Sequence, residues 1–429
     1  MNKKLAFILD VLACAALFLA PVFAVYGSNP QKVLRIMVSE GSSGRAISQA
    51  ARDYEAAKGV KVEVLSYPYG DMHDKQLLEL RNRSKNVDIV NVDSQIWLAE
   101  LNGYLQPLKP YIQKTKFDTG IYVPSMLNMF TMSVHKEKTL LALPMRVGGW
   151  VLIYRTDLFK AKNLAVPKTT DEFLSVAQKL TEGNVYGFAA AFKQTNYLVA
   201  QWDPFLYSFG GNILNDKMTK AAFNSPQGKK ATQFLVDLYR KYKVVPPSAI
   251  DYEQDGVISS MQQGITAMAI TYSPYFPEIN DPKKSKFSGN FAVAPVLPYD
   301  KDSGLNSGVT EVSGWGFGIS KYSANKDLAW DLIKFVCGEA EQKKLAVENH
   351  NSPTVSQAFK DPEYLKVYPE ATAVLTSLQG AKSRPGTIKW TRIEDALSKG
   401  LSTAITGEKT VDKMLADTEK EVNAILAVH

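Results

Sequence analysis

Cysteine is nearly absent from this sequence of 429 residues, which contains two, Cys14 and Cys337. Cys14 lies in the apolar N-terminal segment described below, so the folded chain keeps one thiol and has no internal disulfide. Such a chain depends on its hydrophobic core, and at this length we expect two lobes or one unusually large domain. Cys337 follows a run of apolar residues, which predicts a buried helical position and not a nucleophile.

Histidine is equally scarce, and common catalytic and phosphate-binding motifs are missing. The four histidines form no His-x-x-x-His array, and no GxxxxGK[ST], GxGxxG or GxSxG sequence is present. We therefore predict that the chain is not an enzyme and needs no metal and no cofactor. A carbohydrate-active enzyme stays open as a remote alternative. Glu40, Asp71 and Asp93 each follow a predicted strand, and glycoside hydrolysis uses two carboxylates.

Low-complexity tracts and obvious repeats are absent, which argues against solenoids and propellers. The formal charge is +7, but basic residues alternate with acidic ones, and no dense basic run adjoins aromatic residues. This pattern predicts a solvated surface and no nucleic-acid partner.

The N-terminal segment has the pattern of a cleaved secretory signal. Lys3 and Lys4 precede an apolar run from Val11 that ends at Ala24. We predict cleavage after residue 24 and a periplasmic protein. A retained membrane anchor and lipidation at Cys14 are the alternatives.

The segment that follows alternates between strand and helix patterns. Residues 33–39, 60–65 and 87–92 are rich in β-branched side chains, and residues 47–57 show helical spacing before Gly59. This order predicts a parallel α/β sheet. Ligands of such sheets bind beyond the carboxyl ends of the strands, where we place the loops 39–44, 67–71 and 93–97.

Aromatic side chains gather in turn-like contexts. Tyr272 and Tyr275 stand in a run interrupted by two prolines, which prevents a continuous helix or central strand. Trp97 and Trp315 fall at the borders of predicted elements. A sugar ring needs flat aromatic faces together with planar polar groups, so these residues are candidate sugar contacts. The alternative is that each ring only fixes a loop.

Across nearly the whole chain, the sequence resembles the extracellular solute-binding proteins of ATP-binding-cassette importers, in the group of maltose- and oligosaccharide-binding proteins. Six segments carry this resemblance in the family's order: Val87–Asp93 followed by Trp97; Gly103–Leu108; Leu143-Pro144 leading into Trp150–Phe159; Pro167–Phe173; Gly264–Ile270; and Gly314–Lys321 followed by Ala329–Val336.

The resemblance implies a two-lobed periplasmic-binding-protein fold of type II, with two parallel-sheet α/β lobes joined by a hinge. We expect one lobe at residues 30–144 plus 280–325 and the other at 145–279 plus 326–429. A monomer would capture a small carbohydrate between its lobes and deliver it to a transmembrane permease.

The resemblance also implies contacts for the ligand. Tyr275 matches an aromatic residue that stacks on sugar, and Asp93, Arg146 and Trp315 stand where the family draws polar and aromatic contacts. With Trp97, Tyr272 and Glu40 they form the predicted ligand site.

The chain departs from the family pattern at several positions. Thr170 and Tyr275 replace a common Trp, and residues 147–149 replace an acidic or aromatic segment, so the identity of the sugar stays open. Because Glu40 and Asp93 oppose the charge of Arg146, we expect an uncharged sugar or polyol. An anionic polyol phosphate such as glycerol 3-phosphate is the alternative.

Overall fold

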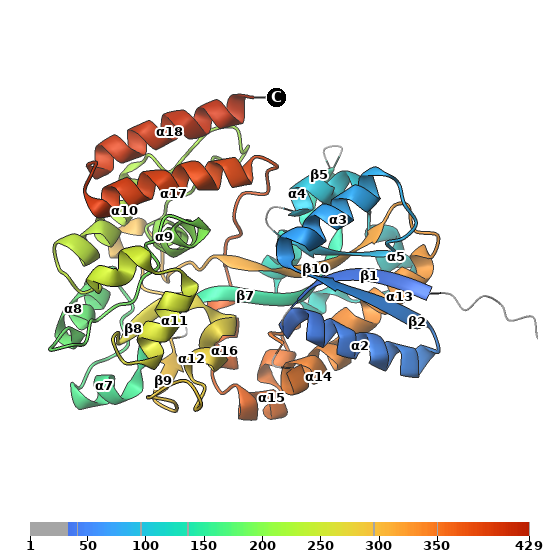
Figure 1. Cartoon of the computed structure of the whole chain (residues 1–429), viewed down its shortest axis with the longest axis horizontal. Coiled ribbons are helices and arrows are strands. Elements are labelled where there is room, and N and C mark those ends of the chain that lie inside the picture. The colour runs from blue at the N-terminus through green and yellow to red at the C-terminus, as the bar shows by residue number, and fades with distance from the viewer. Residues whose placement is uncertain are drawn as a thin grey trace, which may run out of the picture.

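The protein folds into two lobes that share one central sheet (Figure 1). The computed structural model describes residues 33–40, 42–94, 97–134, 137–294, 297–349 and 351–428. The predicted signal segment, including Cys14, lies outside the described residues. None of the described helices combines the length and the apolar character needed to cross a bilayer.

The first lobe is built on the strand order β2-β1-β3-β10-β7. β1 pairs in parallel with β2 and with β3, as the sequence pattern predicted. β10 runs antiparallel between β3 and β7, because it returns from the second lobe, and the sheet is therefore mixed. The strands are β1 (Val33–Ser39), β2 (Lys61–Tyr67), β3 (Ile89–Asp93), β4 (Leu105–Gln106), β7 (Ala142–Arg155) and β10 (Val312–Ser320), beside a hairpin of β5 (Thr131–Val134) and β6 (Glu137–Leu140).

Helices cover both faces of this sheet. One core joins β1 to α2 and α13, and a second core lies under α3, α4 and α6. The backbone N–H of Gly59 closes α2 by donating to the carbonyl of Glu55 at 2.8 Å, with the φ of +68° that favours glycine. The helices are α2 (Ser42–Lys58), α3 (Tyr69–Arg81), α4 (Trp97–Leu101), α5 (Lys109–Thr115), α6 (Pro124–Met129), α13 (Lys326–Cys337) and α14 (Glu339–Asn349).

β7 connects the lobes as one continuous strand. Its first half pairs with β10, and its second half pairs with β8 (Met268–Tyr272) and β9 (Phe291–Val293). The chain crosses between the lobes again just before β10 and a third time through residues 379–389. Figure 1 shows β7 and β10 passing between the two bodies.

The second lobe is largely helical around its own core. Thr169 and Glu172 form the predicted capping box at the start of α8. Between Leu198 and Ser208 every residue of α9 is buried, so this helix has no amphipathic stripe. The helices are α7 (Thr156–Ala161), α8 (Thr170–Leu180), α9 (Asn196–Ser208), α10 (Pro226–Arg240), α11 (Gln254–Gln262), α12 (Phe276–Ile279), α17 (Trp390–Thr406) and α18 (Val411–Ala427).

The expected lobe boundaries need correction at two places. Residues 326–349 belong to the first lobe, because α13 and α14 pack on α2 and the Tyr54 hydroxyl donates to Asp331 at 3.1 Å. Residues 280–294 belong to the second lobe, because β9 pairs with the far half of β7. The chain returns to the first lobe only near residue 310. α15 (Pro362–Val367) and α16 (Ala371–Leu378) contact both lobes, through Ser125 in one and Ser273 in the other.

Cys337 is fully buried at the end of α13, as predicted. Burial raises the pKa of its thiol far above the ordinary value, so the thiol stays protonated. This side chain is part of the core and not a reactive group.

Candidate functional site

The crossing of β3, β10 and β7 brings three predicted site residues side by side. Trp315 of β10 lies opposite Asp93 of β3 and opposite Arg146 of β7. Residues directly opposite one another in antiparallel strands point to the same face. Trp97, at the start of α4, meets Trp315 edge-on with 5.3 Å between ring centroids. These four residues therefore share one region at the carboxyl end of β3.

Tyr272 extends this region toward the second lobe. It ends β8, and its ring lies over Gly148 on β7, where an added Cβ would come within 2.6 Å of ring atoms. Its hydroxyl donates to the carbonyl of Ser313 at 3.3 Å. Burial raises the pKa of Tyr272 to about 12, so the ring is a neutral donor at ordinary pH. Glycine at position 148, a departure from the family pattern, therefore makes room for an aromatic ring.

We expect Gly148→Ala to lower the free energy of unfolding by about 1–3 kcal/mol, because the new methyl group would push the Tyr272 ring aside. Urea denaturation measures this change. Gly103→Ala is the control, since nothing lies within 4 Å of its added Cβ. Equal stability of the two variants would show that Tyr272 does not depend on the space above Gly148.

Tyr275 follows in a short 3-10 turn, Ser273–Tyr275. Its ring centroid lies 5.9 Å from that of Tyr272, and its hydroxyl hydrogen bonds to Tyr197 of α9. Burial raises the pKa of Tyr275, and the nearby charge of Arg146 opposes this rise. We call Asp93, Trp97, Arg146, Tyr272, Tyr275 and Trp315 the aromatic site. Tyr197 is an addition that sequence reasoning missed.

Glu40 is the one predicted site residue that lies apart. It follows β1 at the same end of the sheet, but it is exposed and lines a separate shallow depression with Gly44, Arg45 and Ser48. Its role as a ligand contact stays a prediction. Trp150 and Trp202 are buried in the core of the second lobe.

A buried ionic cluster lies beside the aromatic site, and no sequence pattern indicated it. Arg384 lies 3.1 Å from Asp203 of α9, 2.9 Å from Glu394 of α17 and 3.8 Å from Glu311, the residue before β10. All four side chains are at most 9% exposed. Burial raises the pKa values of the three carboxyl groups, and Arg384 opposes the rise. The ion pairs of Arg384 therefore join the third crossing segment, residues 379–389, to the second crossing segment, which precedes β10.

This cluster makes stability depend on pH. Burial, together with repulsion from Asp93 and Glu394, raises the pKa of Glu311 to about 7. The folded protein thus holds a proton that the unfolded chain has released, and this contribution is complete below about pH 4.5 and lost as pH rises through 7. Glu341, whose pKa is also raised to about 7 by burial, acts in the same window.

We therefore expect a higher melting temperature at pH 5.5 than at pH 8, and a smaller difference in Glu311→Gln. Differential scanning calorimetry at both pH values measures this, with Glu63→Gln, at a surface carboxylate that is 43% exposed, as the control. If the melting temperature of Glu311→Gln differed between pH 5.5 and pH 8 by as much as that of the parent, the proton taken up on folding would not lie in this cluster.

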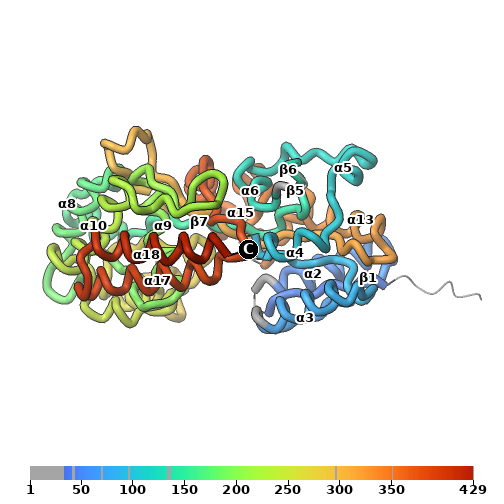
Figure 2. Tube along the Cα trace, turned by 90° about the horizontal axis from the view of Figure 1, so that it is seen from above, coloured from blue at the N-terminus to red at the C-terminus, as the bar shows by residue number. Residues whose placement is uncertain are grey.

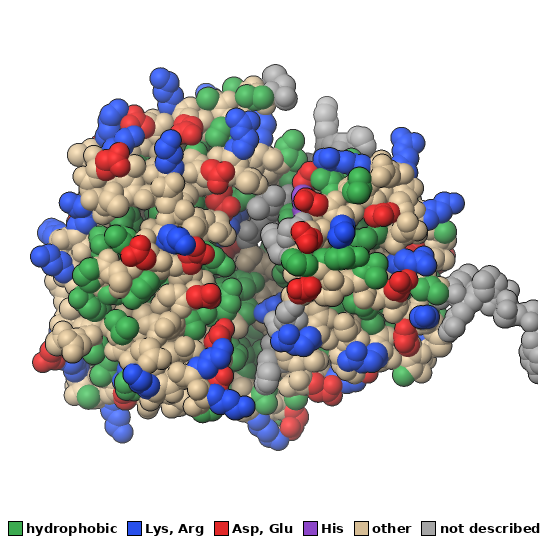
Figure 3. Space-filling view, viewed as in Figure 1, with side chains coloured by type: hydrophobic (Ala, Val, Ile, Leu, Met, Phe, Trp, Pro, Cys, Tyr) green, Lys and Arg blue, Asp and Glu red, His purple; other side chains and the backbone are tan. Residues whose placement is uncertain are grey.

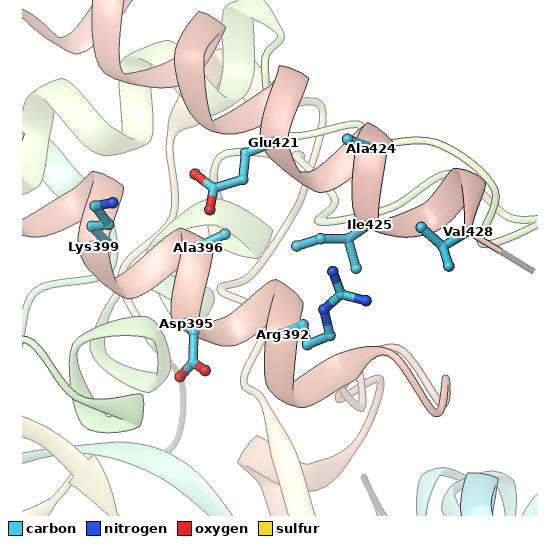
Figure 4. A pocket seen from close by; sticks show the side chains of 8 residues that line it. All are labelled: Arg392, Asp395, Ala396, Lys399, Glu421, Ala424, Ile425 and Val428. Carbon is cyan, nitrogen blue, oxygen red and sulfur yellow. The ribbon is translucent and has the colours of Figure 1, made fainter.

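One described hollow adjoins the aromatic site through Ser94 and Leu98, and another lies on the second lobe. A cavity of about 860 Å3 between the lobes is lined from the first lobe by α4, α6, β5 and β6, and from the second by residues 207–218 and 381–386. A groove of about 480 Å3 lies between α17 and α18. There Arg392 extends toward Ile425, and Glu421 toward Ala396 (Figure 4). Figure 3 shows the hollowed region between the lobes. Among the described residues, no group of three or more His, Cys, Asp or Glu side chains is placed to hold a metal.

Comparison with known proteins identifies the family of this chain. The model of the bacterial extracellular solute-binding proteins matches residues 39–343, and the chain belongs to this family. The predicted resemblance and the two-lobed α/β fold are confirmed.

Individual relatives are distant but cover most of the chain. The galactooligosaccharide-binding protein of Bacillus subtilis is 25% identical over 86% of this chain and 83% of its own. A probable amino-acid ABC transporter periplasmic-binding protein of Sinorhizobium fredii is 22% identical over 92% and 89%. An ABC transporter solute-binding protein from Thermotoga lettingae, solved with α-D-tagatose bound, is 27% identical, with a TM-score of 0.76 over 92% of this chain and all of the other.

Proposed function

We propose that this protein is the carbohydrate-binding component of an ABC importer, which captures a neutral sugar, oligosaccharide or polyol between its lobes and delivers it to a membrane permease. One observation carries the proposal: four aromatic rings, one carboxylate and one guanidinium gather where the strands cross between the lobes. Aromatic faces suit the C–H surface of a sugar, and planar charged groups pair with its hydroxyls.

The mechanism proposed is hinge closure. The crossing segments are few and narrow, so the lobes can rotate about them, and a ligand that contacts both lobes favours the closed state. Asp93, Trp97 and Trp315 come from the first lobe, whereas Tyr272 and Tyr275 belong to the second. A sugar between these groups would bridge the lobes, and no bond of the sugar needs to be broken. The protein is proposed to act as a monomer and as a binding protein without catalytic activity.

Binding to a ligand panel tests this function. Isothermal calorimetry with maltose, D-tagatose, ribitol and D-mannitol should identify at least one ligand, and small-angle scattering should show a smaller radius of gyration with that ligand. Glycerol 3-phosphate and L-amino acids complete the panel. Tighter binding of the phosphate, or of an amino acid, would replace the proposed ligand class. An unchanged radius at saturation would count against closure.

Export to the periplasm is the remaining part of the proposal. It is supported by membership of an extracellular family and by the apolar N-terminal segment. The mature chain is expected to begin at Val25. Intact-mass analysis of exported protein measures this start, and acyl chains on Cys14 would show a lipoprotein instead.

A further inference from the structure

One histidine of the first lobe packs directly against the aromatic site. His73, on α3, has its ring 4.8 Å from the ring of Trp97, measured between centroids, and the two planes are tilted by 44°. Trp97 also meets Trp315 edge-on at 5.3 Å. The Trp97 residue is 3% exposed, and the side chain of His73 is 19% exposed. The position of Trp97 in the site therefore depends on the histidine ring as well as on Trp315.

His73 contacts α4 at a second point, the carboxylate of Glu100. Glu100 follows Trp97 by three residues, so the two side chains lie on the same side of α4. Nε2 of His73 is 3.0 Å from Oε2 of Glu100, and a guanidinium nitrogen of Arg81, at the end of α3, is 3.3 Å from Oε1. Figure 2 shows α3 and α4 beside each other in the first lobe. The helix that begins at Trp97 is thus attached to α3 through both oxygens of Glu100.

Both nitrogens of the His73 ring face carboxylate oxygens, since Nδ1 lies 3.2 Å from Oδ1 of Asp74. A neutral imidazole has one N–H, and an ionised carboxylate only accepts hydrogen bonds. A neutral ring would therefore leave one nitrogen lone pair against a carboxylate oxygen, whereas the charged ring donates to both. Glu100 is the stronger partner, because its side chain is 31% exposed and that of Asp74 is 84% exposed. This geometry fits a charged His73.

The charges around His73 also favour a cation at this place. Lys75 extends over the ring of Tyr67, and Arg35 is paired with Glu63 at 2.8 Å. A cation this close to an indole ring is also attracted by its π face. The charged groups on the elements that pack around the ring are Asp71, Asp74, Lys75 and Arg81 on α3, Glu100 on α4, Asp93 at the end of β3, and Arg35 and Glu63 on β1 and β2.

We propose that His73 is a positioning residue of the ligand site and that its proton strengthens binding of the sugar or polyol. This inference rests on the proposed function. The charged ring holds Trp97 by its contact with the indole and holds α4 through Glu100, so Trp97 and Trp315 stay packed together for the ligand. Loss of the proton weakens the bond to Glu100 and removes the attraction to the indole. Histidine changes its charge between about pH 5 and 8, so the affinity should fall across this range.

The histidine–tryptophan pair is tested without ligand, by tryptophan emission. A protonated imidazole quenches the emission of an adjacent indole, so the emission of the parent should rise between pH 5.5 and pH 8. His73→Gln and Trp97→Phe should each lack this step, and Glu79→Gln on the same helix should keep it. A smaller change can remain in His73→Gln, because the pKa of Glu311 is raised to about 7. An equal step in His73→Gln, or none in the parent, would overturn the inference.

The effect on binding is measured by isothermal calorimetry at pH 6 and pH 8, with the member of the neutral panel that binds. The parent should bind about fivefold more weakly at pH 8, and His73→Gln should show this weaker affinity at both pH values. Glu100→Gln should reduce the pH dependence. Glu79→Gln is the matched control, because it makes the same change on α3 at a carboxylate whose contact is Asn86 at 3.5 Å. It should behave as the parent does.

Three outcomes would contradict this part of the inference. If His73→Gln lowers the melting temperature but keeps the fivefold pH dependence, His73 only stabilises α3. A pH dependence that disappears in Glu311→Gln and not in His73→Gln would place the proton in the cluster of Arg384. Equal affinity of the parent at pH 6 and pH 8 would also refute the inference. If no sugar or polyol binds, the proposed function fails, while the emission titration still decides whether a charged His73 lies against Trp97.

Discussion

Replacing Arg384 by methionine should lower the free energy of unfolding by about 3–5 kcal/mol at pH 8. The substitution keeps a long apolar stem but leaves Asp203, Glu311 and Glu394 buried together without a cation. Removing one partner of a buried ionic group costs this much because the remaining charge has no water to solvate it. The loss should shrink at pH 5.5, where the carboxyl groups can take up protons.

Urea denaturation, monitored by tryptophan fluorescence, measures the free energy of unfolding at pH 8 and at pH 5.5. Arg35→Met is the matched control, because Arg35 pairs with Glu63 at 2.8 Å and both side chains are about 40% exposed. A surface pair of this kind is worth at most about 1 kcal/mol. If Arg384→Met costs no more than Arg35→Met at pH 8, the cluster is solvated in solution and does not fix the third crossing segment.

Local structure was predictable from the sequence where local rules decide it. β1, α2, β2 and β3 lie within two residues of their predicted spans at nearly every end, because the hydrophobic periodicity and the glycine that ends α2 act over a few residues. The same holds for the start of α8, whose capping box involves residues three apart. The sequence did not predict α9, because this helix is buried on every side and therefore shows no amphipathic pattern.

The lobe boundaries needed the structure because strand pairing joins distant segments. A periodic pattern shows that α13 buries one face, but not that α2 is its partner, since the two helices are almost 300 residues apart. β7 is one continuous strand, but its two halves pair with strands of different lobes. A boundary placed by homology at residue 144 therefore falls inside a continuous element.

In the candidate site, too, some residues could be predicted from the sequence and others could not. Tyr272 and Tyr275 could be proposed because prolines mark their segment as a turn, and Trp315 because it falls at the border of a predicted element. The cluster of Arg384 could not be proposed, because its four members come from four segments and each alone is an ordinary charged residue. Only the fold shows that they share one buried space.

The largest expected effect on binding is at Tyr275. Tyr275→Ala should weaken binding of the sugar or polyol by about 1–3 kcal/mol, which is roughly 5–150-fold, through loss of ring burial and stacking. The ring stands next to Tyr272 and within the field of Arg146, and the short turn that carries it is fixed by Pro274. Isothermal calorimetry with the bound panel member gives the change in affinity.

Two further variants separate stacking from a structural role of this ring. Tyr275→Phe keeps the ring and loses the hydrogen bond to Tyr197, so it should cost only about 0.5–1.5 kcal/mol of binding. Tyr239→Ala removes a comparable half-buried tyrosine on α10, where its hydroxyl donates to the carbonyl of Pro247, and should leave binding unchanged. If Tyr275→Ala lowers the melting temperature but keeps the parent's affinity, the ring only fixes its loop. Since Tyr275 is the aromatic residue that the second lobe adds beyond the end of β8, that result would also remove the main contact by which the sugar is proposed to bridge the lobes.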